Sequence, residues 1–213
     1  ILGHALLLFS LLKVWGYDTN LEKTVSLLDW EIPFRSLPAL TGALLVYLHA
    51  AVSSRIAGAG HWEKNTAPFF FPWLGSFFLA CGLIAFSPSL VTATLLSLCA
   101  FVLVEGGRKY SSPHLQIQGV LFCLCAFGMA GGVNLHSEAS FYGVSERLVS
   151  IGPALFFWIY TCYRLSLTPW FFSAILSAGC LSGVLSLSHF ELGASSAPMV
   201  WGLIAGIWIL AGI

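Results

Sequence analysis

Residues 88–106 read PSLVTATLLSLCAFVLVEG, and residues 114–133 read HLQIQGVLFCLCAFGMAGGV. Each stretch is almost continuously apolar over roughly the 20 residues that a helix needs to cross a bilayer. Strands of a membrane barrel would instead alternate between apolar and polar residues, because their two faces meet lipid and lumen. Glycine pairs close both stretches, at 106–107 and 131–132, as expected where helices end. These two runs therefore predict two successive transmembrane helices.

Six more apolar segments surround this pair, at roughly 1–16, 37–58, 68–87, 147–165, 168–188 and 198–213. Prolines such as Pro38, Pro169 and Pro198 fall near the predicted starts, where a missing backbone N–H does no harm. The sequence therefore predicts an all-α polytopic transmembrane helix bundle of about eight spans.

The composition excludes several classes of protein. Of the 213 residues, 58% are hydrophobic and 8% charged, with nine basic residues balancing nine acidic ones. A soluble domain carries about 25% charged residues, so this chain cannot cover itself with a solvated surface. A globular cytoplasmic enzyme, a nucleic-acid binder and a disordered tail are excluded. Both chain ends fall inside apolar runs without a secretory signal pattern, and we expect a longer parent polypeptide.

The two halves of the chain share short motifs in the same order. Each half has two glycines at the same spacing, then an arginine, then Pro-Ala-Leu. In the first half these are Gly3 and Gly16, Arg35 and residues 38–40. In the second half they are Gly119 and Gly132, Arg147 and residues 153–155. An offset of four spans preserves orientation, which predicts two parallel four-helix units at 1–113 and 114–213. The alternative, that apolar helices simply resemble one another, stays open.

Loop charges indicate the orientation. Five basic residues fall at short turns on the side of the membrane where the N-terminal end lies, namely Arg55, Lys64, Arg108, Lys109 and Arg164. Four basic residues fall on the other side. Positive charge in short loops marks the cytoplasmic side. We therefore expect the N-terminal end in the cytoplasm and the acidic loops on the opposite side.

The loop after the first span carries a helix signature. Thr19 and Glu22 form a capping-box pattern, and Leu21, Val25 and Leu28 follow at helical spacing. This pattern predicts a short amphipathic helix at about 19–29, lying on the membrane interface. It could serve as a lid or docking surface, or simply as a connector packed on the bundle.

Charged side chains near the membrane are few. Lys13 lies one turn from the end of the first span and can extend its amine to the interface. Arg35 and Arg147 fall at helix starts, where a positive charge is unfavourable for the helix dipole. We expect these two arginines to pair with nearby acids such as Glu31 and Glu146, or to contact an anionic lipid or ligand.

Two histidines lie at matching depths on predicted neighbouring helices. His4 and His49 could together ligate a haem or chlorin. The alternative is that each imidazole hydrogen-bonds a neighbouring helix.

Small residues offer packing faces. Gly179 and Gly183, like Gly202 and Gly206, stand four residues apart, a spacing that lets helices approach closely. These faces predict packing either within the bundle or against a partner subunit. The six cysteines all fall inside predicted spans, and we interpret them as packing residues rather than a disulfide framework.

The stretch Gly3–Val14, Asp18 in the loop and Arg35 resemble the bacterial polytopic predicted membrane proteins classed as a domain of unknown function. The stretch from Glu105 to Arg164 is similar to them as well, although the second half has Met129 and Asn134 where the family pattern has Lys and Asp. The resemblance implies a bacterial inner-membrane location and a longer parent chain. It implies no catalytic residues.

No catalytic motif is present in the sequence: neither a Ser-His-Asp arrangement nor a metalloprotease helix, a phosphate loop or paired intramembrane carboxylates. We therefore expect a non-enzymatic scaffold or accessory subunit, in contact with lipid and other membrane subunits. A carrier or channel for a lipid or small solute is the first alternative. A subunit that holds haem or chlorin is the second.

Overall fold

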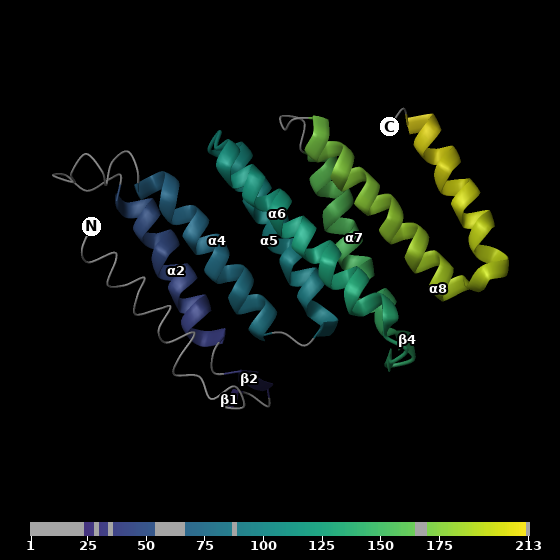
Figure 1. Cartoon of the computed structure of the whole chain (residues 1–213), viewed down its shortest axis with the longest axis horizontal. Helices are drawn as coiled ribbons and strands as arrows, with labels where there is room; N and C mark the ends of the chain where they lie inside the picture. The colour runs from purple at the N-terminus through teal and green to yellow at the C-terminus, as the bar shows by residue number, and fades with distance from the viewer. Residues whose placement is uncertain are drawn as a thin grey trace. The chain divides into compact units, whose positions relative to one another are not determined.

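The computed structural model describes residues 24–27, 30–33, 36–53, 67–86, 89–164 and 170–211. Within these ranges the chain forms seven helices and two short hairpins (Figure 1), which confirms the all-α prediction. The helices are α2 (Ser36–Ser53), α4 (Ala67–Phe86), α5 (Ser89–Lys109), α6 (Pro113–Gly132), the 3₁₀ helix η1 (Asn134–His136), α7 (Glu146–Arg164) and α8 (Trp170–Ala211). The predicted span 1–16 lies outside the described residues.

Helix boundaries follow the sequence signals. Pro113 stands at the first turn of α6, where its missing N–H costs nothing, and the helix ends at Gly132. The described residues of the two predicted spans 168–188 and 198–213 belong to one element, α8, which has one interruption. Gly193 there has φ 73° and ψ 169°, a conformation essentially restricted to glycine. After this interruption α8 turns back on itself (Figure 1), and Trp201 of its last part donates to Ser188 of its first part at 2.9 Å.

Among the residues that the structure describes, two stretches are long and apolar enough to cross a membrane, Val91–Lys109 and Pro113–His136, with mean hydropathies of 1.4 and 1.6. Less than half of each stretch is buried inside the protein, 39% and 44%. Ser36–Val52 and Phe69–Ala85 are shorter apolar helices. The structure thus supports two of the eight predicted spans by length and composition.

The chain divides into two compact units, residues 1–88 and 89–213. This division places α4 and α5 in different units. The structure groups α5 with the later helices because α5 packs against α6 and α7. The four-helix sequence repeat stays a prediction.

In the first unit, α2 packs against α4. Val46 and Phe71 form the buried contact, and the Tyr47 hydroxyl lies 2.6 Å from Ser76 Oγ. A Cβ at Gly75 would lie 3.0 Å from the Tyr47 ring. The missing side chain therefore lets the two helices approach closely.

The first unit also contains a β-hairpin where we expected an interfacial helix. Strand β1 (Thr24–Leu27) pairs antiparallel with β2 (Trp30–Pro33). The predicted helix at 19–29 is therefore wrong over residues 24–27. The sequence Thr-Val-Ser-Leu alternates polar and apolar residues with two β-branched members, which favours a strand. The strand predicted by this two-residue alternation formed, and the helix predicted by the spacing of Leu21, Val25 and Leu28 did not form over residues 24–27.

In the second unit, small side chains fill the space between α5, α6 and α7. Ala93, Ala100, Ala126 and Ala154 are buried. A polar link ties α5 to α7 within this core, because Trp158 Nε1 donates to Ser97 Oγ at 2.5 Å. Ser97 Oγ in turn donates to the Ala93 carbonyl at 2.6 Å, so both polar groups are satisfied.

Candidate functional site

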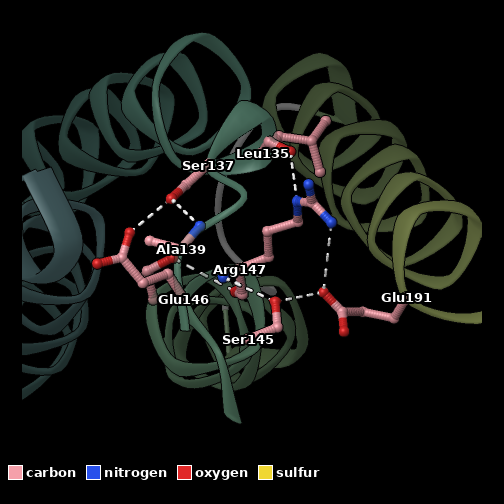
Figure 2. Close-up of polar contacts among 8 residues, drawn as sticks. Leu135, Ser137, Ala139, Ser145, Glu146, Arg147 and Glu191 are labelled. Atoms are coloured by element: carbon pink, nitrogen blue, oxygen red, sulfur yellow. Dashed lines mark hydrogen bonds and ion pairs between the residues drawn. The ribbon is translucent and has the colours of Figure 1, made fainter. Parts of the chain in front are cut away.

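Arg147, one of the predicted site residues, lies at the start of α7 (Figure 2). Its Nε donates to the Leu135 carbonyl at 2.9 Å, and its Nη1 lies 3.9 Å from Glu191 Oε1 on α8. Its guanidinium also stands 5.0 Å from the centroid of the Phe190 ring. The expected pairing with an acid is present, but the partner is Glu191 rather than Glu146. A contact of Arg147 with lipid phosphate stays a prediction.

Further hydrogen bonds surround Arg147 (Figure 2). Ser145 Oγ donates to Glu191, and Ser137 Oγ donates to Glu146 Oε2 at 2.5 Å. The Glu146 backbone N–H donates to the Ala139 carbonyl at 3.0 Å. We call Ser137, Ser145, Glu146, Arg147 and Glu191 the Arg147 cluster. It joins the loop after α6, the start of α7 and the kinked part of α8.

The hairpin in this loop has strands β3 (Ser140–Phe141) and β4 (Val144–Ser145). Tyr142 and Gly143 at its turn have positive φ, 51° and 81°. Because of this turn, Ser145 and Glu146 lie at the start of α7. Glu146 is the acid of the first turn, where a negative charge is favourable for the helix dipole.

A second charged cluster lies at the other end of α7. Arg164 Nε and Nη2 donate to the two carboxylate oxygens of Glu105 on α5, at 2.8 and 3.2 Å. Arg108 approaches the same carboxylate at 3.6 Å. We call Glu105, Arg108 and Arg164 the Glu105 cluster. Arg108 and Arg164 were expected on the same side of the membrane from their loop positions, but their pairing with Glu105 was not predicted.

A cavity of about 230 Å³ lies between α6, α7 and α8. Aromatic and small side chains form most of its lining. The rings of Phe127 and Trp158 pack edge to face, with their centroids 4.1 Å apart. Gly179 and Gly183 also line it, where Ser182 and Ser186 add hydroxyl groups. The cavity is therefore mainly apolar.

The glycine pairs have different surroundings. A Cβ at Gly179 would clash with the Phe127 ring, and a Cβ at Gly183 would lie 3.0 Å from Leu155. Gly179 and Gly183 therefore pack inside the second unit. A Cβ at Gly202 or Gly206 would meet nothing within 4 Å. These two glycines leave space for close approach by another helix.

Other candidates are partly or wholly outside the described residues. The His49 ring packs edge-on against Phe71 at 4.7 Å. His4, Lys13 and Arg35 lie outside the described ranges, so the haem or chlorin pair and the lipid contacts stay predictions. Over the part of the chain that the structure describes, no group of three or more His, Cys, Asp or Glu residues could hold a metal.

The cysteines are free thiols, and one pair is close. Cys162 on α7 and Cys180 on α8 have their sulfurs 3.5 Å apart. We expected both cysteines to be packing residues. Their proximity depends on how α7 and α8 are rotated against each other, and the sequence carries no signal for that rotation.

Comparison with protein-family models, curated proteins and solved structures found no match to this chain. The resemblance to the bacterial membrane protein family therefore stays a prediction.

Proposed function

We propose that this chain is an integral membrane subunit that acts as a scaffold or accessory component of a larger membrane assembly, without catalytic chemistry of its own. The separation of its two charged clusters carries this proposal. The Arg147 cluster and the Glu105 cluster stand at opposite ends of α7, whose 19 residues rise about 28 Å at 1.5 Å per residue. Between Arg147 and Arg164, α7 has no charged side chain.

This length matches the hydrocarbon core of a bilayer, which is about 30 Å thick. Charged groups are costly inside that core, so each cluster belongs near a headgroup layer. Within each cluster an arginine pairs with a glutamate, Arg147 with Glu191 and Arg164 with Glu105, and the exposed fraction of the Arg147 side chain is only 15%. The spacing of the clusters supports a lipid layer between them, although α7 does not reach the mean hydropathy of Val91–Lys109 and Pro113–His136.

The surface supports the same proposal. Large apolar side chains are exposed on α2, α4, α5, α7 and α8, including Leu44, Phe77, Val102, Phe156 and Leu203. A water-soluble protein rarely exposes apolar surface on so many elements, and such surface marks contact with lipid or with other proteins. Lipid and partner subunits would both cover it.

The open glycines on α8 support the presence of a partner subunit. In lipid, helices associate through close packing at small residues rather than through the hydrophobic effect. Gly202 and Gly206 leave open space beside α8, and Met199 and Leu203 nearby are exposed. This stretch of α8 supports close packing of a further helix.

Membrane fractionation and mild-detergent purification test the proposal. The chain should stay in the membrane through an alkaline carbonate wash and purify with at least one partner in fixed stoichiometry. Gly206→Leu should release that partner without loss of helical signal, because the site has room for the side chain. Gly152→Leu, at an equally open position on α7, is the matched control and should retain the partner. A chain released by carbonate, or one that purifies as a lone monomer, would refute the proposal.

A second candidate function is a carrier or channel for a lipid or small solute, and the cavity between α6, α7 and α8 favours it. Its mainly apolar lining suits an acyl chain rather than an ion. Native mass spectrometry of protein purified in mild detergent would show bound lipid, and Ser186→Trp, which fills the cavity, should remove it. Lipid retained by this variant would count against the cavity as the binding site.

A further inference from the structure

Two cysteine side chains lie close together where α7 packs against α8. Cys162 Sγ is 3.5 Å from Cys180 Sγ, and the two residues are 18 positions apart in the chain. A disulfide bond needs its sulfurs about 2.0 Å apart. The remaining approach of about 1.5 Å is within the range of side-chain torsions. The two thiols are therefore placed for bond formation with each other.

The two cysteines differ in access. Cys180 is only 2% exposed, whereas Cys162 is partly exposed. Cys162 also lies two residues before Arg164, so it stands at the polar end of α7 beside the Glu105 cluster. A small oxidant arriving from water meets Cys162 first. Cys180 is then the neighbouring thiol that can react with the oxidised sulfur.

We propose that Cys162 and Cys180 form an oxidation site at which hydrogen peroxide converts the two thiols into an intramolecular disulfide. The Cys162 thiolate attacks the peroxide and breaks its O–O bond; one oxygen stays as a sulfenic acid, and the other leaves as water. The Cys180 sulfur then attacks the Cys162 sulfur, the S–O bond breaks, and the hydroxyl leaves with the thiol proton as a second water. Two thiols and one peroxide thus give one disulfide and two waters; the sulfurs together lose the two electrons that the peroxide gains.

The disulfide acts on the cavity between α6, α7 and α8. Trp158 lies one turn before Cys162, and Gly179 directly precedes Cys180; both line the cavity. A covalent link between Cys162 and Cys180 fixes these two walls against each other. Oxidation at this pair therefore restricts the cavity, while reduction restores the freedom of α7 and α8 to separate.

Thiol counting and peptide mapping of the full chain test the proposal. The protein in mild detergent is treated with hydrogen peroxide, unfolded and labelled with a maleimide. Two of its six cysteines should be protected until a reductant is added. Mass spectrometry of the unreduced digest should find a peptide that joins Cys162 to Cys180. A link between any other two cysteines, or six reactive thiols after treatment, would overturn the proposal.

Variants identify the order of the steps. In Cys180→Ser the sulfenic acid at Cys162 has no partner thiol on α8, so dimedone should label Cys162. Cys125 is exposed on α6, and Cys125→Ser is the control that should keep the internal link while removing cross-links between chains. Cys123 is buried on α6. Dimedone labelling at Cys123 instead of Cys162, or loss of the internal link in Cys125→Ser, would contradict the assignment. Mapping of the unmodified chain remains decisive even if a variant fails to fold.

Discussion

The hydrogen bond between Ser97 and Trp158 gives the sharpest test of the packing in the second unit. Ser97→Ala removes the acceptor of the indole N–H, while Ser97 is fully buried and Trp158 only 1% exposed. A buried donor left without an acceptor costs about 1–3 kcal/mol. For a chain of this size that loss lowers the melting temperature by about 2–12 °C. We expect this decrease in circular dichroism melts of the protein in mild detergent.

A double-mutant cycle isolates the bond from other effects. Trp158→Phe removes the N–H and some indole volume, so it also destabilises the chain. Ser97→Ala combined with Trp158→Phe should cost less than the sum of the single variants, by about 0.5–3 kcal/mol. Ser182→Ala is the matched control, because its hydroxyl bonds only the Gly179 carbonyl of its own helix. Equal melting temperatures for Ser97→Ala and Ser182→Ala would refute the reasoning. So would a double variant whose loss of unfolding free energy equals the sum of the two single losses.

Three other variants address the charged clusters and the histidines. Glu105→Gln should loosen the joint between α5 and α7, seen as faster hydrogen exchange near Arg164; the effect should shrink in high salt, since this pair is partly exposed. Glu191→Gln should weaken the attachment of Ser145 and speed exchange in the loop before α7, and unchanged exchange there would count against the Arg147 cluster as a clamp. The cofactor hypothesis predicts a haem or chlorin absorption band in purified protein that His49→Ala abolishes, and a colourless preparation would exclude it.

The first and last residues of helices could be predicted from the sequence because each apolar run is long and is bounded by a proline, a glycine or a charged residue. The predicted 114–133 and 147–165 agree with α6 and α7 to within one residue. Local signals also conflict: the four residues Thr24–Leu27 fit two periods, and strand pairing with Trp30–Pro33 decided between them. Short segments are therefore the weakest part of such predictions.

Pairings between helices could not be predicted, because they depend on helix rotation and on residues distant in sequence. Arg147 was recognised as needing an acid, but Glu191 comes from another helix and Glu146 next to it binds Ser137 instead. The Cys162–Cys180 contact arises in the same way. Gly179 and Gly202 belong to motifs with identical spacing. In the structure the space beside Gly179 is occupied by the Phe127 ring, whereas the space beside Gly202 is open.

The reversal at Gly193 has a consequence for membrane topology. Trp201 Nε1 lies 2.9 Å from Ser188 Oγ, so the two parts of α8 lie side by side in opposite directions. If both cross the bilayer, they add an even number of crossings. A reporter enzyme inserted between α7 and α8 and another fused at Ala211 should therefore report the same compartment, while one inserted at Gly193 reports the opposite one.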